Sequence, residues 1–128
     1  MGVTCINMKK TLLTIAILFS PIAFAGNWVQ VNDWATPLKV NVVSLEKNLW
    51  VYVFENSNQK YKAKDLYTFQ YKTINKSELF INALCDTFDV VGLDENFIEV
   101  DDGGTCYFQV VYNFKKNTFT KLEVNGEA

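Results

Sequence analysis

The first 25 residues have the layout of an export signal, and this feature constrains the fold most because it limits the size of the folded part. Residues 9–10 are lysines, residues 12–19 form a short apolar core, and residues 23–25 read Ala-Phe-Ala, with small residues where a signal peptidase cleaves. Residues 1–7 precede this signal as a non-native or upstream extension. We therefore expect residues 26–128, about 103 residues, to form a single small exported domain.

The exported location predicts the state of the cysteines. Cys5 leaves with the signal, so Cys85 and Cys106 have only one possible pairing. The periplasm and the extracellular medium are oxidising, which favours a disulfide between them. Such a bridge closes a loop of about 20 residues and stabilises the fold by about 3 kcal/mol in the chain-entropy model. We expect a structural bridge, because redox-active pairs are closely spaced, as in C-x-x-C.

The hydropathy of the chain predicts no transmembrane segment. The apolar part of the signal is too short to span a bilayer, and no later segment reaches the roughly 20 apolar residues that a spanning helix needs. We therefore expect the mature chain to be periplasmic or secreted.

Alternation of apolar and polar residues, the period of a half-buried strand, recurs along most of the domain. It predicts strands at residues 28–31, 38–43, 49–54, 66–71, 90–93, 96–100, 105–114 and 118–124. The polar residues 46–48 and 115–117 predict turns, and the acidic and glycine residues at 101–104 are a strong turn signal. The last two strands and the turn between them form the clearest hairpin.

One segment has a helical pattern instead, and it predicts a helix over about residues 76–88. Asn75 and Glu78 have the spacing of an N-cap and its N3 partner. Apolar residues follow at helical spacing, at Ile81, Leu84, Cys85 and Phe88. The predicted fold is therefore an α+β domain in which a curved antiparallel sheet packs on one helix. In this arrangement the disulfide joins the helix to the last hairpin.

The charges are divided along the chain. Lysine is the only basic residue type, and loss of the signal leaves 10 lysines against 14 acidic residues, a formal net charge of −4. Residues 77–114 contain eight acidic residues and no lysine. The lysines gather at Lys60, Lys62, Lys64, Lys72, Lys76, Lys115 and Lys116. This division argues against nucleic acid, which requires a basic surface. It suits either steering toward a basic protein or a solvated surface that only aids solubility.

The residue types present exclude most catalytic machinery. Without histidine the chain lacks the usual general base, the Ser-His and Cys-His nucleophile pairs and the commonest zinc ligand. It also lacks arginine for a bidentate phosphate clamp. Carboxylates remain, but a glycosidase cleft is large for a domain of this size, and the acidic residues do not follow the calcium-loop pattern. We therefore predict no enzymatic activity, no metal and no cofactor.

Two groups of residues are candidates for binding a protein partner. The acidic group contains Asp94, Glu95, Glu99, Asp101 and Asp102, with Thr105 and Tyr107 flanking the turn. The aromatic group contains Trp50, Tyr52 and Phe54. The predicted strand at 49–54 is apolar on both faces, so its aromatic face is either buried under another layer or an exposed platform of the kind found in binding hot spots.

Together these observations predict a periplasmic binding protein without enzymatic activity. The leading hypothesis is an inhibitor or immunity protein that occludes a basic cell-wall hydrolase or toxin, with the acidic group steering and pairing with the partner. One alternative is an envelope structural or assembly factor that docks through the aromatic face or a sheet edge. A second alternative is a small-molecule or sugar binder that uses the aromatic face.

Overall fold

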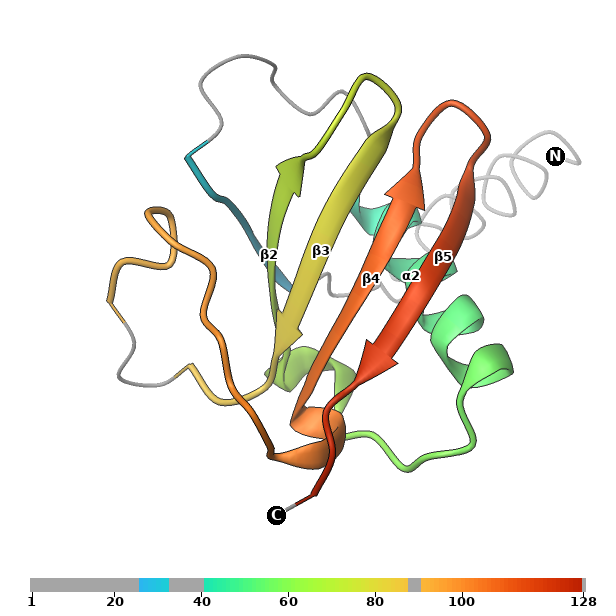
Figure 1. The fold of residues 1–128 in the computed structure, drawn as a ribbon. Helices are drawn as coiled ribbons and strands as arrows, with labels where there is room; N and C mark the ends of the chain where they lie inside the picture. The colour runs from blue at the N-terminus through green and yellow to red at the C-terminus, as the bar shows by residue number, and fades with distance from the viewer. Residues whose placement is uncertain (1–25, 33–40, 88–90, 128) are drawn as a thin grey trace, which may run out of the picture.

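A computed structural model of the protein describes residues 26–32, 41–87 and 91–127. The predicted export signal lies outside the described residues. In chain order the elements are β1 (Asn27–Gln30), α2 (Val42–Asn56), the 3-10 turn η1 (Lys64–Leu66), β2 (Thr68–Thr73), β3 (Glu78–Leu84), the 3-10 turn η2 (Gly104–Cys106), β4 (Tyr107–Asn113) and β5 (Thr118–Val124). The described residues form one α-helix and one sheet, which confirms the predicted α+β class (Figure 1).

The five strands form one open sheet in the order β1-β2-β3-β4-β5. β1 runs parallel to β2, and the other three neighbouring pairs are antiparallel. The sheet is therefore mixed, and the expectation of a purely antiparallel sheet is wrong. A parallel pair requires a crossover connection, and the chain makes it here by passing through α2, which lies behind the sheet in Figure 1.

The helix lies at a different place in the chain from the predicted one. α2 contains the residues expected to form the strand at 49–54 and the turn at 46–48, and it begins inside the strand expected at 38–43, of which residues 38–40 lie outside the described residues. Asn41 caps this helix, because its Oδ1 accepts the backbone N–H groups of Val43 and Ser44 at 3.0 and 3.2 Å.

The apolar side of α2 explains why this segment is helical. Its buried apolar residues are Leu45, Leu49, Trp50 and Val53. They recur at intervals of one, three and four residues, which places them on one side of a helix. The valines and aromatic residues between them gave the segment the composition of a strand. Burial of that one side against the sheet outweighs the weak helix propensity of these residues.

The helix predicted over residues 76–88 is a strand. β3 covers Glu78–Leu84, and Leu79, Ile81 and Ala83 alternate into the core. The Asn75–Glu78 pair that indicated a helix start closes the β2–β3 hairpin instead, since Asn75 Oδ1 accepts the N–H groups of Ser77 and Glu78. The same side-chain chemistry that caps a helix also forms an Asx turn, so the motif did not distinguish the two structures.

The strands predicted at 90–93 and 96–100 are also wrong. Residue 90 lies outside the described residues, and residues 91–100 contain no strand. This segment crosses the sheet face that α2 does not cover, and much of its backbone hydrogen bonding is to side chains. Its apolar residues are therefore explained by packing onto the sheet, not by pairing with another strand.

The other strand predictions are confirmed with small shifts. β1 lies within one residue of the strand predicted at 28–31, and β2 begins two residues after the one predicted at 66–71. The last hairpin is β4 and β5, joined by the polar turn expected at 115–117, where Asn117 has a φ of +55°. Alternation with a matching turn signal therefore predicted these strands correctly.

The two faces of the sheet carry different side chains. The face toward α2 is apolar, and its fully buried members include Phe69, Leu79, Ile81, Phe108 and Val110. The opposite face carries amides, with Gln70, Asn82 and Gln109 in register on β2, β3 and β4. The helix and the sheet thus form two layers, and the opposite face is left to be covered by the long connection between β3 and β4.

A disulfide joins Cys85 and Cys106, which confirms the predicted pairing. Their Cα atoms are 4.9 Å apart, and the Cys85 N–H donates to the Cys106 carbonyl at 2.9 Å. The bridge continues the β3–β4 ladder by one position, whereas the prediction placed it between a helix and a hairpin. It therefore joins the two ends of the β3–β4 connection.

Candidate functional site

The β3–β4 connection carries all five predicted acidic residues. We call residues 91–103 the acidic loop. The side chains of Asp94, Glu95, Glu99, Asp101 and Asp102 are all exposed. Within the part of the chain that the structure describes, none of these carboxylates forms an ion pair. In Figure 1 the loop runs beside β2 and down to η2. The structure therefore brings the acidic group together on one continuous surface segment.

A row of amide side chains supports this loop from below. Gln70, Asn82 and Gln109, here called the amide row, stand side by side on β2, β3 and β4. Asn82 Nδ2 donates to Gln70 Oε1 at 3.0 Å, and Gln109 Nε2 donates to Asn82 Oδ1 at 3.2 Å. Gln70 is fully buried and Asn82 is 4% exposed. Buried amides of this kind require partners, and the loop backbone supplies the remaining ones.

The amide row holds the middle of the acidic loop through its backbone. Gln70 Nε2 donates to the carbonyls of Leu93 and Asn96, both at 2.8 Å, and Gln70 Oε1 accepts the Ile98 N–H at 2.9 Å. Asn82 Nδ2 also donates to the Ile98 carbonyl at 2.9 Å. These hydrogen bonds fix the backbone and leave the acidic side chains directed elsewhere. The loop is therefore ordered without any secondary structure of its own.

Two further asparagines hold the flanks of the loop. The Asn32 N–H donates to the Asp94 carbonyl at 3.0 Å, and its side chain donates to the Glu95 carbonyl. Near the other end, Asn125 Nδ2 donates to the carbonyls of Val100 and Asp102. Together with the amide row, these hydrogen bonds tie the backbone of the loop to the sheet or its margins at several residues between Leu93 and Asp102. Such preorganisation lowers the entropy lost when a loop binds a partner.

A cavity of about 320 Å³ lies between the acidic loop and the sheet. Its lining is Phe80, Asn82, Phe97, Ile98, Glu99, Val100, Gln109, Glu123 and Asn125. Glu99 and Glu123 bring carboxylates to it, and none of the described lysines lines it, so the cavity suits a cationic group. The rings of Phe80 and Phe97 meet edge to face at 5.1 Å and supply an apolar wall.

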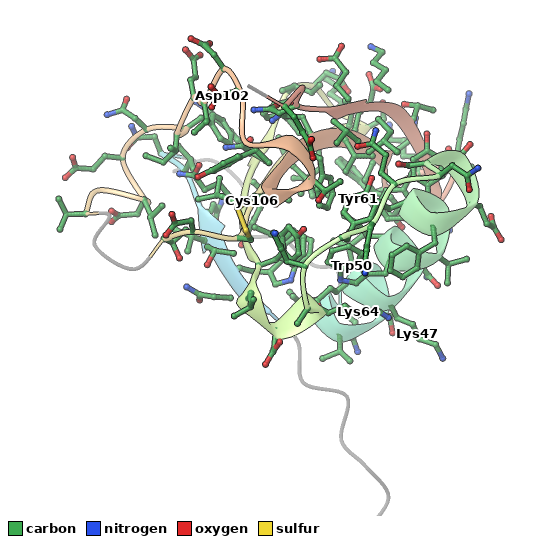
Figure 2. The ribbon with its side chains drawn as sticks, turned by 90° about the horizontal axis from the view of Figure 1, so that it is seen from below. Lys47, Trp50, Tyr61, Lys64, Asp102 and Cys106 are labelled. Atoms are coloured by element: carbon green, nitrogen blue, oxygen red, sulfur yellow. A yellow bond between two sulfur atoms is a disulfide. The ribbon has the colours of Figure 1, made fainter. Side chains whose placement is uncertain are left out.

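Lys47 and Lys64 lie on the opposite side of the molecule from Asp102 of the acidic loop. Figure 2 shows Lys47 and Lys64 on the side of α2, and Asp102 on the side of the uncovered sheet face. Lys64 Nζ lies 5.4 Å from the centre of the Phe54 ring, an exposed cation–π contact. Lys72, in contrast, is two residues from Gln70 on β2 and lies on the same face of the sheet as the amide row, so the charges are only partly divided between the two faces.

Thr105 and Tyr107 flank the turn as predicted, but they support it from within. Thr105 is 9% exposed, and its Oγ1 donates to the Lys60 carbonyl at 2.7 Å. The Thr105 carbonyl accepts the Tyr67 hydroxyl at 2.6 Å. Burial raises the pKa of Tyr67 above its ordinary value, although the N–H of Lys62 lowers it somewhat. The phenol therefore remains a neutral donor to this turn at physiological pH.

Tyr107 packs its ring directly against the turn. Gly103 has a φ of +93°, and a Cβ at this position would lie 2.4 Å from the Tyr107 ring. Glycine is therefore required at residue 103 both by its backbone conformation and by the ring beside it. Tyr107 itself is half-buried, so only part of its surface is available to a partner.

Of the two alternatives for the aromatic group, the exposed platform is not formed. Because α2 is a helix, Trp50, Tyr52 and Phe54 do not share a face. Trp50 is 2% exposed, Tyr52 stacks on Phe119 of β5 at 5.5 Å, and Phe54 is half exposed. Trp50 and Phe54 are four residues apart and stack at 5.5 Å. The structure thus places two of the three in the packing between helix and sheet and one at its margin.

The loop-supporting residues were missed in the sequence. Asn32, Gln70, Asn82, Gln109 and Asn125 are the amides that position the acidic loop. No local signal distinguished Gln70, because it belongs to the polar side of an alternating strand, with Thr68 and Lys72. Only the structure shows that this amide is buried and therefore needs polar partners, which the acidic loop supplies.

We expect Gln70→Ala to lower the free energy of unfolding by about 2 kcal/mol, because it leaves buried loop groups without partners. Gln109→Ala is the matched control, since it removes an amide on the same sheet face that makes one hydrogen bond. It should cost about 1 kcal/mol. Urea unfolding measures both values, and hydrogen exchange at the Ile98 amide should quicken in Gln70→Ala alone. Equal losses of stability in the two variants would contradict the anchoring role of Gln70.

The described residues contain no further site of a familiar kind. Among residues 26–32, 41–87 and 91–127, no three carboxylate or thiol groups are arranged to hold a metal ion. The same ranges contain no helix with the length and hydropathy of a membrane span. Comparison with known proteins found no matching family model, no matching curated protein and no matching solved structure.

Proposed function

We propose that this chain is an exported binding protein without enzymatic activity, and that it occludes a basic protein partner in the manner of an inhibitor or immunity protein. The observation that carries the proposal is the acidic loop, whose backbone is tied at its middle and both flanks while its five carboxylates are exposed and unpaired. A surface held in this way suits recognition, because little ordering entropy remains to be lost on binding.

The partner class follows from the charge of this surface. Carboxylates concentrated on one face accelerate encounter with a basic protein and align it during approach. The cavity beneath the loop, with Glu99 and Glu123 in its lining, offers a place for one lysine or arginine side chain of that partner. A basic cell-wall hydrolase or toxin, whose substrate cleft or surface carries such residues, fits this chemistry. The disulfide is consistent with a role outside the cytoplasm.

The test compares two double variants that change the charge equally. Asp101→Asn with Asp102→Asn alters the acidic loop, whereas Glu55→Gln with Asp65→Asn alters exposed residues on the side of α2. Purified basic cell-wall muramidases, amidases and endopeptidases serve as probes, with peptidoglycan clearing as the readout. We expect the wild type to inhibit one of these classes. The loop variant should associate about fivefold more slowly at low salt, and the control variant should not.

The salt dependence makes the test decisive. The difference between wild type and loop variant should shrink as ionic strength rises, because exposed charges are screened. Failure to inhibit any of the three hydrolase classes would contradict the hydrolase-inhibitor proposal. Equal slowing by the loop and control variants would contradict the role assigned to the acidic loop.

A second candidate function, docking to another envelope protein, is favoured by apolar side chains on the outer side of α2. Val43, Val51 and Phe54 are 47%, 50% and 50% exposed. The β5 edge is less suited to docking, because Lys121 has a φ of +55° and a register shift interrupts the pairing with β4. Val51→Ser with Phe54→Ser should abolish docking under this alternative and leave hydrolase inhibition unchanged under the first.

A further inference from the structure

Glu46 is a carboxylate buried between α2 and β1, far along the chain from the acidic loop. It is 5% exposed, although it lies on a helix whose other charged residues face solvent. Its Oε1 accepts the Trp28 indole N–H at 2.9 Å and the backbone N–H of Gly26 at 2.5 Å. No lysine among the described residues pairs with it. A buried carboxylate with only neutral donors is costly unless a positive charge lies beside it.

Gly26 occupies a position that accepts no side chain. A Cβ there would lie 2.8 Å from the Tyr67 carbonyl oxygen, and 3.0 Å from both the Phe69 ring and Glu46 Oε1. The backbone nitrogen of residue 26 is thus held against Glu46 by close contact on several sides. This same nitrogen belongs to the peptide bond after Ala25, where the sequence predicts signal cleavage.

We propose that cleavage between Ala25 and Gly26 completes this site, by giving the buried Glu46 carboxylate the free α-ammonium group of Gly26 as its ion-pair partner. A signal-removing peptidase adds water to the Ala25 carbonyl carbon and breaks the C–N bond. The oxygen of the water stays on Ala25 as part of a new carboxylate, and both hydrogens of the water pass to the Gly26 nitrogen, which becomes an α-ammonium group. One neutral donor is thereby replaced by a cation with three donors, and hydrogen bonds between charged groups are the stronger ones.

The ion pair ties the first strand to the helix. β1 has four residues and pairs on one side only, with β2, at the edge of the sheet. Trp28 also reaches Glu46, and its ring stacks on Phe69 at 4.6 Å. The Glu46 carboxylate therefore holds both Gly26 and Trp28 against α2. The folded domain gains this contact in full only after its leader is removed, so processing and folding stability are coupled.

The inference rests on the export signal in the proposed function, but on neither the acidic loop nor the partner. The first measurement is the mass of the product exported from a bacterial host that expresses the full chain. We expect an N-terminus at Gly26. A product that begins at any other residue would overturn the proposal, whatever the outcome of the hydrolase assays.

The second measurement distinguishes the effect of the positive charge on the Gly26 nitrogen from the effect of removing the leader. Insertion of one serine between Ala25 and Gly26 leaves a processed chain in which residue 26 again carries an amide nitrogen. We expect its unfolding equilibrium constant, from urea titration, to be about tenfold larger than that of the normal product. In a Glu46→Gln background the same insertion should change this constant less than twofold. An equal effect in both backgrounds would show a steric cause and overturn the proposal.

A third measurement holds even if the Glu46→Gln chain does not fold. In the normal product, the Gly26 α-amine should acylate with acetic anhydride at least tenfold more slowly in the native state than in urea. The exposed lysines serve as the internal reference, since their amines face solvent. An α-amine as reactive in the native state as in urea would contradict the ion pair.

Discussion

We expect Trp50→Ala to lower the free energy of unfolding by about 3–5 kcal/mol, the range measured for removal of large buried aromatic side chains. Trp50 is 2% exposed and lies between α2 and the sheet (Figure 2). Five aromatic rings have centroids 5.0–6.2 Å from its own, namely Phe54, Tyr61, Tyr67, Phe69 and Phe108. The cavity left by alanine opens onto all of them, so little of it can collapse.

Two variants control for this loss. Trp50→Phe keeps an aromatic ring, and Trp50 Nε1 has no hydrogen-bond partner among the residues that the structure describes, so its removal breaks no bond to them. We expect it to cost clearly less than alanine. Val51→Ala lies on the outer side of the same helix, is 50% exposed in the wild type, and should change stability by about 0.5 kcal/mol or less. Urea unfolding checks all three. A Trp50→Ala chain no less stable than Val51→Ala would contradict the central place of Trp50 in the core.

We expect loss of the disulfide, in a double variant with Cys85→Ser and Cys106→Ser, to lower the free energy of unfolding by about 3 kcal/mol. The bridge joins residues 21 apart in sequence, and in the chain-entropy model a loop of this length gives that value. For a domain of this size the loss is a large share of the total stability. Urea titration of oxidised and variant protein measures it, and the mass of the exported protein with and without reductant confirms the bridge.

The same variant tests whether the bridge serves the acidic loop. The loop lies wholly between the two cysteines, so without the bridge no covalent link closes it, and only the β3–β4 ladder and hydrogen bonds such as those of Asn125 hold it. We expect faster hydrogen exchange in the loop than in the β4–β5 hairpin, and, under the proposed function, slower association with the basic hydrolase that serves as partner. Unchanged stability would contradict the structural role of the bridge. Uniform exchange across loop and hairpin would contradict its specific effect on the loop.

The features that could be predicted are those that neighbouring residues or a simple residue count decide without any long-range contact. The β4–β5 hairpin combines alternation on both strands with a polar turn at Asn117, and it forms as expected. The cysteine pairing also followed directly, because only two cysteines follow the predicted signal. In the hairpin, neighbouring residues favour one structure, and for the cysteines the count allows one pairing. Neither prediction needs a contact between distant parts of the chain.

The prediction assigned a strand to the segment that is a helix and a helix to the segment that is a strand, because the local pattern of each segment is compatible with either structure. Residues 42–56 are rich in valine and aromatic residues, which favours a strand, yet burial of one side against the sheet makes them helical. Residues 78–84 follow a capping motif, yet their neighbours β2 and β4 make them a central strand. The secondary structure of such a segment depends on the elements that pack against it in the fold. A local sequence pattern does not show which elements these are.

The sequence by itself determined the acidic character of residues 94–102, the single possible disulfide and the last hairpin, because composition, count and short-range alternation decide these. Only the tertiary structure decided that Gln70 and Asn82 would hold the acidic loop, that Trp50 would be core, and that Glu46 would meet Gly26. Each of these contacts joins residues far apart along the chain. The free energy of such a contact depends on burial and partners that exist only once the sheet, the helix and the loop have come together.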